Sequence, residues 1–297
     1  GRIDARGAAL FSLAVLGLVY ALTELGQRDA HPSMAVVGVS MLVAVGSLLL
    51  FLREETKAAD PLIDLMLIRR REFAFTNALN FFYGAGIFGL FSFIPLYAQE
   101  AYGMSHEESG ILLSPRAVAM MVASIFISML LPRTGYRKPI LFGLVLMVGS
   151  LLLLSRGYHD VSIFGLGLSN FVYLSVIVAV TGLAFGTAGP AANNAAIELA
   201  PDKIAAITGL RGMFRTLGGT LGTAVVVLVA SRASSEASGL QTAFLGLAFV
   251  NMVTMALVFG ISDKVGAREA VTLAANRATA EAARTAAEAS GGPAEGA

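Results

Sequence analysis

Arginine residues stand inside long apolar stretches of this sequence, where a charged group costs free energy and a binding role is the first hypothesis. Arg116 is the clearest case, because it lies about two helical turns inside an apolar run. A guanidinium at that depth could attract an anionic group or pair with a hidden acid. Alternatively, the long side chain reaches back to the polar edge of the run and acts as an anchor. The sequence leaves both interpretations open.

Two stretches combine helical spacing with small residues. In each, four residues recur at i, i+4, i+7 and i+11 and therefore share one helix face. Glycines on such a face allow a neighbouring helix to approach closely. We favour tight packing as their role. The alternative is that the faces slide during gating, with Glu198 as the nearest acid that could neutralise the arginines. The first face holds Arg211, Arg215, Gly218 and Gly222; the second holds Gly182, Gly186, Gly189 and Asn193, with Pro190 beside it.

Other polar residues within the apolar runs are candidates for lining a cavity. Seven of the 18 Phe residues lie between positions 73 and 93, and an aromatic cavity with a few polar groups suits lipophilic ligands. For any single Phe, an orientation toward lipid is the competing interpretation. The cavity candidates are Asn80, Tyr83, Gln99, Arg116 and Asn251.

Several kinds of chemistry are not expected. The chain has no Cys, which excludes disulfides and thiolate chemistry. Its three His residues, at 31, 106 and 159, fall in predicted loops without metal-ligand spacing, so we expect no metal site. Acidic residues such as Glu24, Glu100 and Glu198 stand near the ends of apolar runs. A buried proton carrier is therefore not expected in these residues.

Eight apolar runs must position these side chains. Each is about 17–25 residues long, which suffices for a helix to cross a hydrocarbon core of about 30 Å. The composition agrees, with 56% hydrophobic and only 14% charged residues. We therefore expect an all-α polytopic membrane protein whose surroundings are a lipid bilayer, with no nucleic-acid partner. The runs cover residues 8–26, 35–52, 75–98, 109–131, 139–155, 170–192, 207–231 and 242–261.

The basic residues predict the orientation. Fifteen of the 21 Lys and Arg fall in one alternating set of loops and three, Arg28, Arg156 and Arg232, in the other. The positive-inside rule places the richer set in the cytoplasm. Both termini are then cytoplasmic, in a multi-pass protein of the plasma (cytoplasmic or inner) membrane.

The longest cytoplasmic loop divides the chain. Residues 1–72 are expected to hold two helices and an amphipathic surface helix that begins at Pro61. Residues 73–262 are expected to form a six-helix unit, and residues 263–297 a cytoplasmic tail that frays into disorder. The apolar stretch 161–168 is expected to lie along the outer surface.

One short loop resembles a family motif. Residues Leu131–Lys138 resemble the Asp-Arg-x-Gly-Arg-Arg loop of the major facilitator superfamily, although Pro132 replaces the acid and Tyr136 splits the pattern. Segments 95–105, 109–115, 193–201 and 209–222 are similar to fourteen-span drug:proton antiporters of the EmrB/QacA type. The basic half of the motif survives as Arg133, Gly135, Arg137 and Lys138.

The resemblance covers residues 1 to about 262 and implies two linker helices followed by the second six-helix half of a longer parent. It implies proton-coupled export of lipophilic or amphipathic compounds, including drugs, with the proton as coupling ion and no other cofactor. The coupling acids would lie in the missing first half, and a periplasmic adaptor subunit, which some relatives use, stays an open question.

Three alternatives are kept. An uptake or metabolite permease of the same superfamily is one, although common twelve-span permeases lack the two-helix insert. A membrane enzyme would need clustered His or acidic residues near one interface, and the loops show no such cluster. A non-transporting fragment that binds partners is the third.

Overall fold

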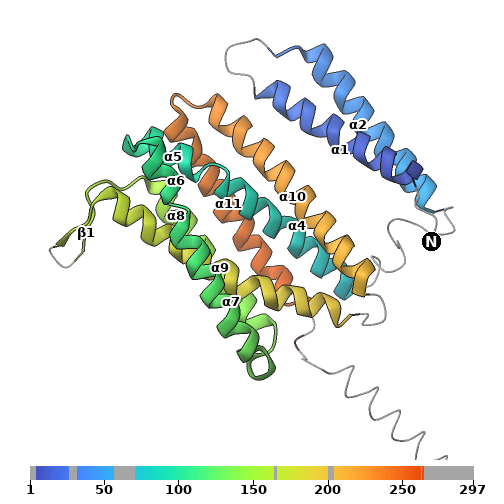
Figure 1. Ribbon diagram of the computed structural model, residues 1–297. Coiled ribbons are helices and arrows are strands. Elements are labelled where there is room, and N and C mark those ends of the chain that lie inside the picture. Colours follow the sequence, from blue (N-terminus) through green and yellow to red (C-terminus); the bar gives the residue numbers. More distant parts are fainter. Residues whose placement is uncertain are drawn as a thin grey trace, which may run out of the picture. The chain divides into compact units, whose positions relative to one another are not determined.

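The protein is seen in a computed structural model that describes residues 5–26, 32–56, 71–163, 166–199, 204–261 and 263. Apart from one short hairpin, the elements of these residues are helices (Figure 1). The predicted all-α membrane fold is thereby confirmed. The surface helix expected after Pro61 and the tail after residue 263 lie outside the described residues. The elements are α1 (Ala5–Leu25), α2 (Met34–Glu55), α4 (Arg71–Phe91), α5 (Ile94–Tyr102), α6 (His106–Ile111), α7 (Ser114–Thr134), α8 (Arg137–Arg156), β1 (Ser162–Ile163), β2 (Leu166–Gly167), α9 (Asn170–Ile197), α10 (Ile204–Arg232) and α11 (Glu236–Val258).

Seven helical segments of the described chain are long and apolar enough to cross a membrane, and the bent pair α4–α5 makes an eighth. The third apolar run, 75–98, was expected to form one helix, but it bends by 42° between α4 and α5. Pro95 stands in the first turn of α5. A backbone N–H in the first turn has no partner within the helix, so a proline there loses no hydrogen bond and favours the start of a new helix. Pro115 likewise stands in the first turn of α7, after the short α6.

The stretch 161–168 departs from a helical fold. Ser162 pairs with Gly167 in an antiparallel hairpin of two two-residue strands. From the sequence, this segment was expected only to lie along the outer surface. Its secondary structure was not predicted, because an apolar run of eight residues fits either a strand or a short helix.

Helices α4 and α10 are pressed together at glycines on both sides (Figure 1). Gly218 of α10 meets the backbone carbonyl of Phe81, and a Cβ on Gly222 would lie 2.7 Å from the Cα of Ala85. On the α4 side, Gly84 likewise meets the backbone carbonyl of Arg215 in α10. Any side chain larger than hydrogen at these positions would push the two backbones apart.

Helices α7 and α9 meet in the same way. Gly182 faces the carbonyl of Arg116, and Gly186 faces that of Met120 one turn further along. On the other side of α9, Gly143 of α8 approaches Ala184 and Ala188. The two glycine faces predicted from helical spacing are thus both in backbone contact with a neighbour.

The helix pair α1–α2 packs on itself and on α10. Gly17 lies against the Ser40 carbonyl, and the rings of Phe11 and Phe51 are 5.1 Å apart. At one end of the pair, Arg232 of α10 donates a 3.0 Å hydrogen bond to the carbonyl of Leu25. The described residues belong to one compact unit that ends at Asp263.

The Gly222→Leu variant tests the backbone contact between α4 and α10. Four added heavy atoms must displace the Ala85 backbone, so we expect overpacking of about 3 kcal/mol and a severalfold lower yield of folded, monodisperse protein. Gly246→Leu is the control, because nothing lies within 4 Å of a Cβ at that exposed position. Equal yields of the two variants, measured by size-exclusion chromatography, would contradict the packing role.

Candidate functional site

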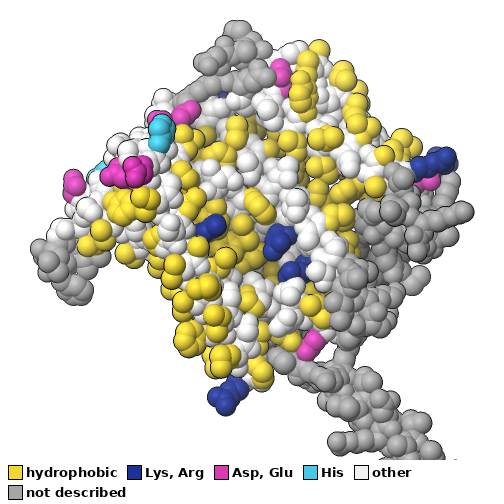
Figure 2. Space-filling model, viewed as in Figure 1, with side chains coloured by type: hydrophobic (Ala, Val, Ile, Leu, Met, Phe, Trp, Pro, Cys, Tyr) yellow, Lys and Arg dark blue, Asp and Glu magenta, His cyan; other side chains and the backbone are white. Residues whose placement is uncertain are grey.

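One face of the molecule carries Lys or Arg side chains among apolar and uncharged groups, while the acidic side chains visible there lie toward its edges (Figure 2). This arrangement is unusual in membrane-length helices, where a charge needs water or protein around it. The arginines of the described chain that lie inside candidate spans, away from the span ends, are Arg116, in the first turn of α7 but within the span that α6 begins, and Arg211 and Arg215 of α10.

Arg116 of α7 stacks on an aromatic ring. Its guanidinium carbon lies 3.9 Å from the centroid of Phe91, a cation–π contact with the last residue of α4. The nine residues of α5 continue the span beyond Phe91, so this contact is not at the end of the span, and the Arg116 side chain is half-buried. The Arg116 Nε is buried and has no hydrogen-bond partner among the described residues.

A row of aromatic rings continues from Phe91. The ring of Phe185 on α9 lies 5.1 Å from Phe91 and 5.1 Å from Tyr83. The Tyr83 hydroxyl donates a 3.4 Å hydrogen bond to the Phe185 carbonyl, and it lies 3.7 Å from a Cβ placed on Gly189. The row therefore joins α4 and α9 across the middle of the bundle.

Arg211 and Arg215 of α10 stand at the far end of this row. Both guanidinium charges act on the Tyr83 hydroxyl. The Arg215 side chain is exposed, whereas the Nε of Arg211 is buried with no hydrogen-bond partner in the described part of the chain. We call the set Tyr83, Phe91, Arg116, Phe185, Arg211 and Arg215 the arginine–aromatic face.

Glu198 was named from the sequence as the nearest acid that could neutralise Arg211 or Arg215. In the structure it hydrogen-bonds the hydroxyl of Tyr136, which stands in the loop before α8. Burial and the adjacent Glu198 carboxylate raise the pKa of the Tyr136 phenol, so this tyrosine remains a neutral donor.

Two of the predicted cavity residues lie inside helix interfaces. Asn80 is 1% exposed and donates to the Thr76 carbonyl of its own helix. Asn251 is fully buried, donates to the Leu247 carbonyl and lies against Gly86 of α4. These amides therefore occupy helix contacts and do not belong to the arginine–aromatic face.

The remaining predicted residues are scattered. Gln99 donates a 2.8 Å hydrogen bond to Ser109 and ties α5 to α6. Pro190 lies within α9, which continues to Ile197, and the Asn193 side chain is half-buried. Of the five cavity candidates, the structure thus brings only Tyr83 and Arg116 together. Phe91 and Phe185 were not singled out, since a Phe in an apolar run gives no signal of its own.

The motif loop between α7 and α8 ties two helix ends together. Gly135 ends α7 with φ +74°, a conformation that glycine adopts without strain. Arg137 donates from its backbone N to the Asp263 carboxylate at 2.8 Å. Its guanidinium donates to the carbonyls of Ile261 at 2.8 Å and Phe259 at 3.0 Å, and so caps the end of α11. Arg133 and Lys138 are exposed.

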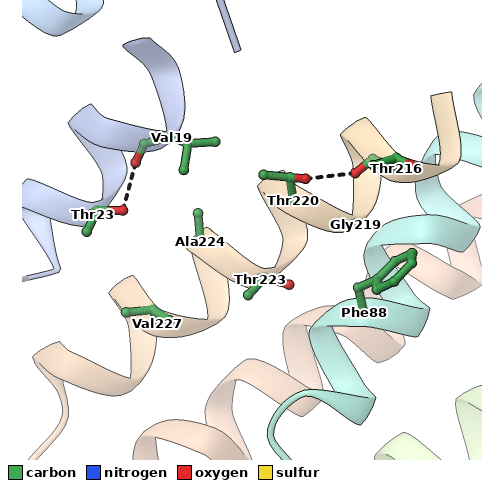
Figure 3. Close-up of a pocket in the computed structure, with 9 residues that line it drawn as sticks. All are labelled: Val19, Thr23, Phe88, Thr216, Gly219, Thr220, Thr223, Ala224 and Val227. Carbon is green, nitrogen blue, oxygen red and sulfur yellow. Dashed lines mark hydrogen bonds between the residues drawn. The ribbon is translucent and has the colours of Figure 1, made fainter. Parts of the chain in front are cut away.

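A separate groove of about 380 Å³ lies between α1 and α10 (Figure 3). The ring of Phe88 from α4 covers Gly219 there. Two of its threonine hydroxyls are already bonded within their helices, Thr23 to the Val19 carbonyl and Thr220 to the Thr216 carbonyl. The groove is therefore largely apolar, and it contains no residue of the arginine–aromatic face. Its lining residues are Val19, Thr23, Phe88, Thr216, Gly219, Thr220, Thr223, Ala224 and Val227.

A bundle of membrane-length helices with a charged and aromatic face among them defines a multi-pass membrane protein. Residues 6–223, and in a second match residues 77–286, fit the sequence profile of the Major Facilitator Superfamily. The chain belongs to this superfamily of transporters, which supports the transporter interpretation over the membrane enzyme.

Known relatives include proteins named for drug resistance. Multidrug transporter protein MdtP of Bacillus subtilis is 29% identical over 234 residues, which cover 78% of this chain and 42% of that protein. Multidrug resistance protein Stp of Mycobacterium tuberculosis is 28% identical, covering 76% and 40%. The tetracenomycin C resistance and export protein of Streptomyces glaucescens is 28% identical, covering 77% and 41%. The chain thus spans less than half the length of these relatives.

The Arg137→Gln variant tests the cap on α11. It removes the charge and one of the two carbonyl contacts, so we expect a loss of about 1 kcal/mol, reduced by the partial exposure of the site, and a lower Tm in detergent. Arg137→Lys should recover part of the loss. Lys138→Gln is the control, because that neighbouring side chain is exposed. A Tm that falls as far in the control as in Arg137→Gln would refute the cap.

Proposed function

We propose that this chain is part of a longer proton-coupled exporter of lipophilic or amphipathic compounds, drugs included. The observation that carries the proposal is the arginine–aromatic face, in which aromatic rings from α4 and α9 run between arginines from α7 and α10. Rings supply apolar contact and guanidinium groups supply a few oriented donors, the combination typical of small-molecule sites. Relatives named for multidrug transport and export support the same function.

The orientation is part of the proposal. The loops that carry most of the basic residues include Arg133, Arg137 and Lys138, so this end of the bundle is placed in the cytoplasm together with both termini. The membrane is the plasma (cytoplasmic or inner) membrane. Six-helix units in such transporters work in pairs that rock around a central site, so the arginine–aromatic face would turn toward the other half of the parent.

Proton coupling is assigned to residues outside this chain. Within the described helices, acidic side chains stand near helix ends, as Glu24, Glu72 and Glu236 do. A titratable group deep in the membrane is the usual proton carrier. The first half of the parent would have to supply it.

Dye efflux from cells that express the full-length parent gene tests the function. We expect the cells to lose a loaded lipophilic dye faster than vector controls, and a protonophore to abolish the difference. A broad dye panel with no efflux, while the protein is present in the membrane, would overturn export and favour a metabolite permease. Efflux that persists with the protonophore would overturn proton coupling alone.

Arg116→Ala in the full-length parent tests the face itself. The substitution removes the charge and the contact with Phe91, so we expect about tenfold slower efflux of the dye that the parent exports fastest, at normal expression. Arg156→Ala is the matched control, because Arg156 is exposed at the end of α8. If Arg116→Ala transports at the rate of the control, Arg116 has no role in transport and serves only as an anchor at the polar edge of its span.

A further inference from the structure

We propose that the arginine–aromatic face selects amphipathic organic anions: molecules with a carboxylate, sulfonate or phenolate group attached to a planar ring system. The inference rests on the proposed function, because it names the class of compound that this half of the exporter binds.

The first step concerns charge. Three guanidinium groups belong to residues inside candidate membrane spans: Arg116 in the span 106–134, and Arg211 and Arg215 in the span 207–232. The described acidic residues near the spans are at helix ends, and Glu198 is engaged with Tyr136. The face is therefore a local excess of positive charge in surroundings of low polarity, where attraction of an anion is much stronger than in water.

The second step concerns hydrogen bonds. The Nε atoms of Arg116 and Arg211 are buried, and neither has a hydrogen-bond partner among the described residues. A buried donor without an acceptor is costly, and a guanidinium is shaped to donate to two oxygens of one anionic group. An oxygen-rich anion would satisfy donors that the helices themselves leave open.

The third step concerns shape. Arg116 lies at the level of Phe91, and the backbone of Arg215 lies against Gly84, seven residues earlier on α4. Seven helical residues correspond to about 10 Å along the axis, the length of a fused ring system. The rings of Phe91 and Tyr83 lie near the two levels, and the Phe185 ring joins them. A planar anion could thus contact rings along its length and an arginine at its charged end.

The same geometry disfavours lipophilic cations. A cation would be repelled by the three arginines, and the Arg116 guanidinium already occupies the Phe91 ring that could otherwise receive it. The rival role for these arginines is a gate, in which they pair with acids from the rest of the parent. A gate would affect all substrates alike, whereas a binding face would distinguish substrates by charge.

Two xanthene dyes of similar size and opposite charge, anionic fluorescein and cationic rhodamine 123, test the inference. We expect cells with the full-length parent to export fluorescein faster than rhodamine 123. The variants Arg116→Ala, Arg211→Ala and Arg215→Ala should each slow fluorescein efflux about tenfold, whereas rhodamine 123 efflux should fall far less. Each Arg→Lys variant keeps the charge and should recover part of the fluorescein rate, and Arg156→Ala should match the unchanged protein.

Binding to the purified full-length protein separates recognition from transport. Fluorescence polarisation should show about tenfold weaker fluorescein binding in the three alanine variants, at a Tm equal to that of Arg156→Ala. Export of rhodamine 123 in preference to fluorescein would overturn the inference and leave the proposed export intact. An equal loss for both dyes would overturn it in favour of a gate, and fluorescein binding without efflux of either dye would overturn the proposed function alone.

Discussion

Close approach of helix backbones at glycine is the constraint on which the rest of the helix bundle depends. Lipid is as apolar as the side chains themselves, so burial alone does not hold helices together in a bilayer, and tight van der Waals packing must do it. Gly84, Gly218 and Gly222 provide this for α4 and α10, and Gly182 and Gly186 provide it for α7 and α9. The contacts join backbones, so they also determine the depth at which each helix presents its side chains.

The arginine–aromatic face follows from those two contacts. The carbonyl of Arg116 is pressed against Gly182, and that of Arg215 against Gly84. These anchor points bring an arginine from α7 and another from α10 toward the same pair of helices, α4 and α9, whose rings meet between them. Packing and the proposed recognition therefore share residues, because the helix turns that hold the bundle together are the turns that carry the charges.

Much of this fold could be predicted from the sequence, and the site could be predicted only in part. Span length and periodicity identified the candidate spans of the described residues and the glycine faces, because both signals are local. Contacts between residues on different helices could not be predicted from the sequence. Asn251 and Arg116 are both polar residues in apolar runs, yet Asn251 is fully buried against Gly86, whereas Arg116 stacks on Phe91. The bend before Pro95 was also missed, because the run of apolar residues continues through it.

The arginines also constrain what can surround the face in a working protein. A guanidinium exposed to hydrocarbon at mid-membrane depth costs several kcal/mol, and only those near a helix end can relieve this by reaching the interface. Arg116 is held on Phe91 with α5 beyond it, and Arg215 is exposed three helical turns inside α10. The face must therefore border water or more protein. In the proposed parent, the other half would face this surface and supply both, enclosing a hydrated cavity lined by the arginines.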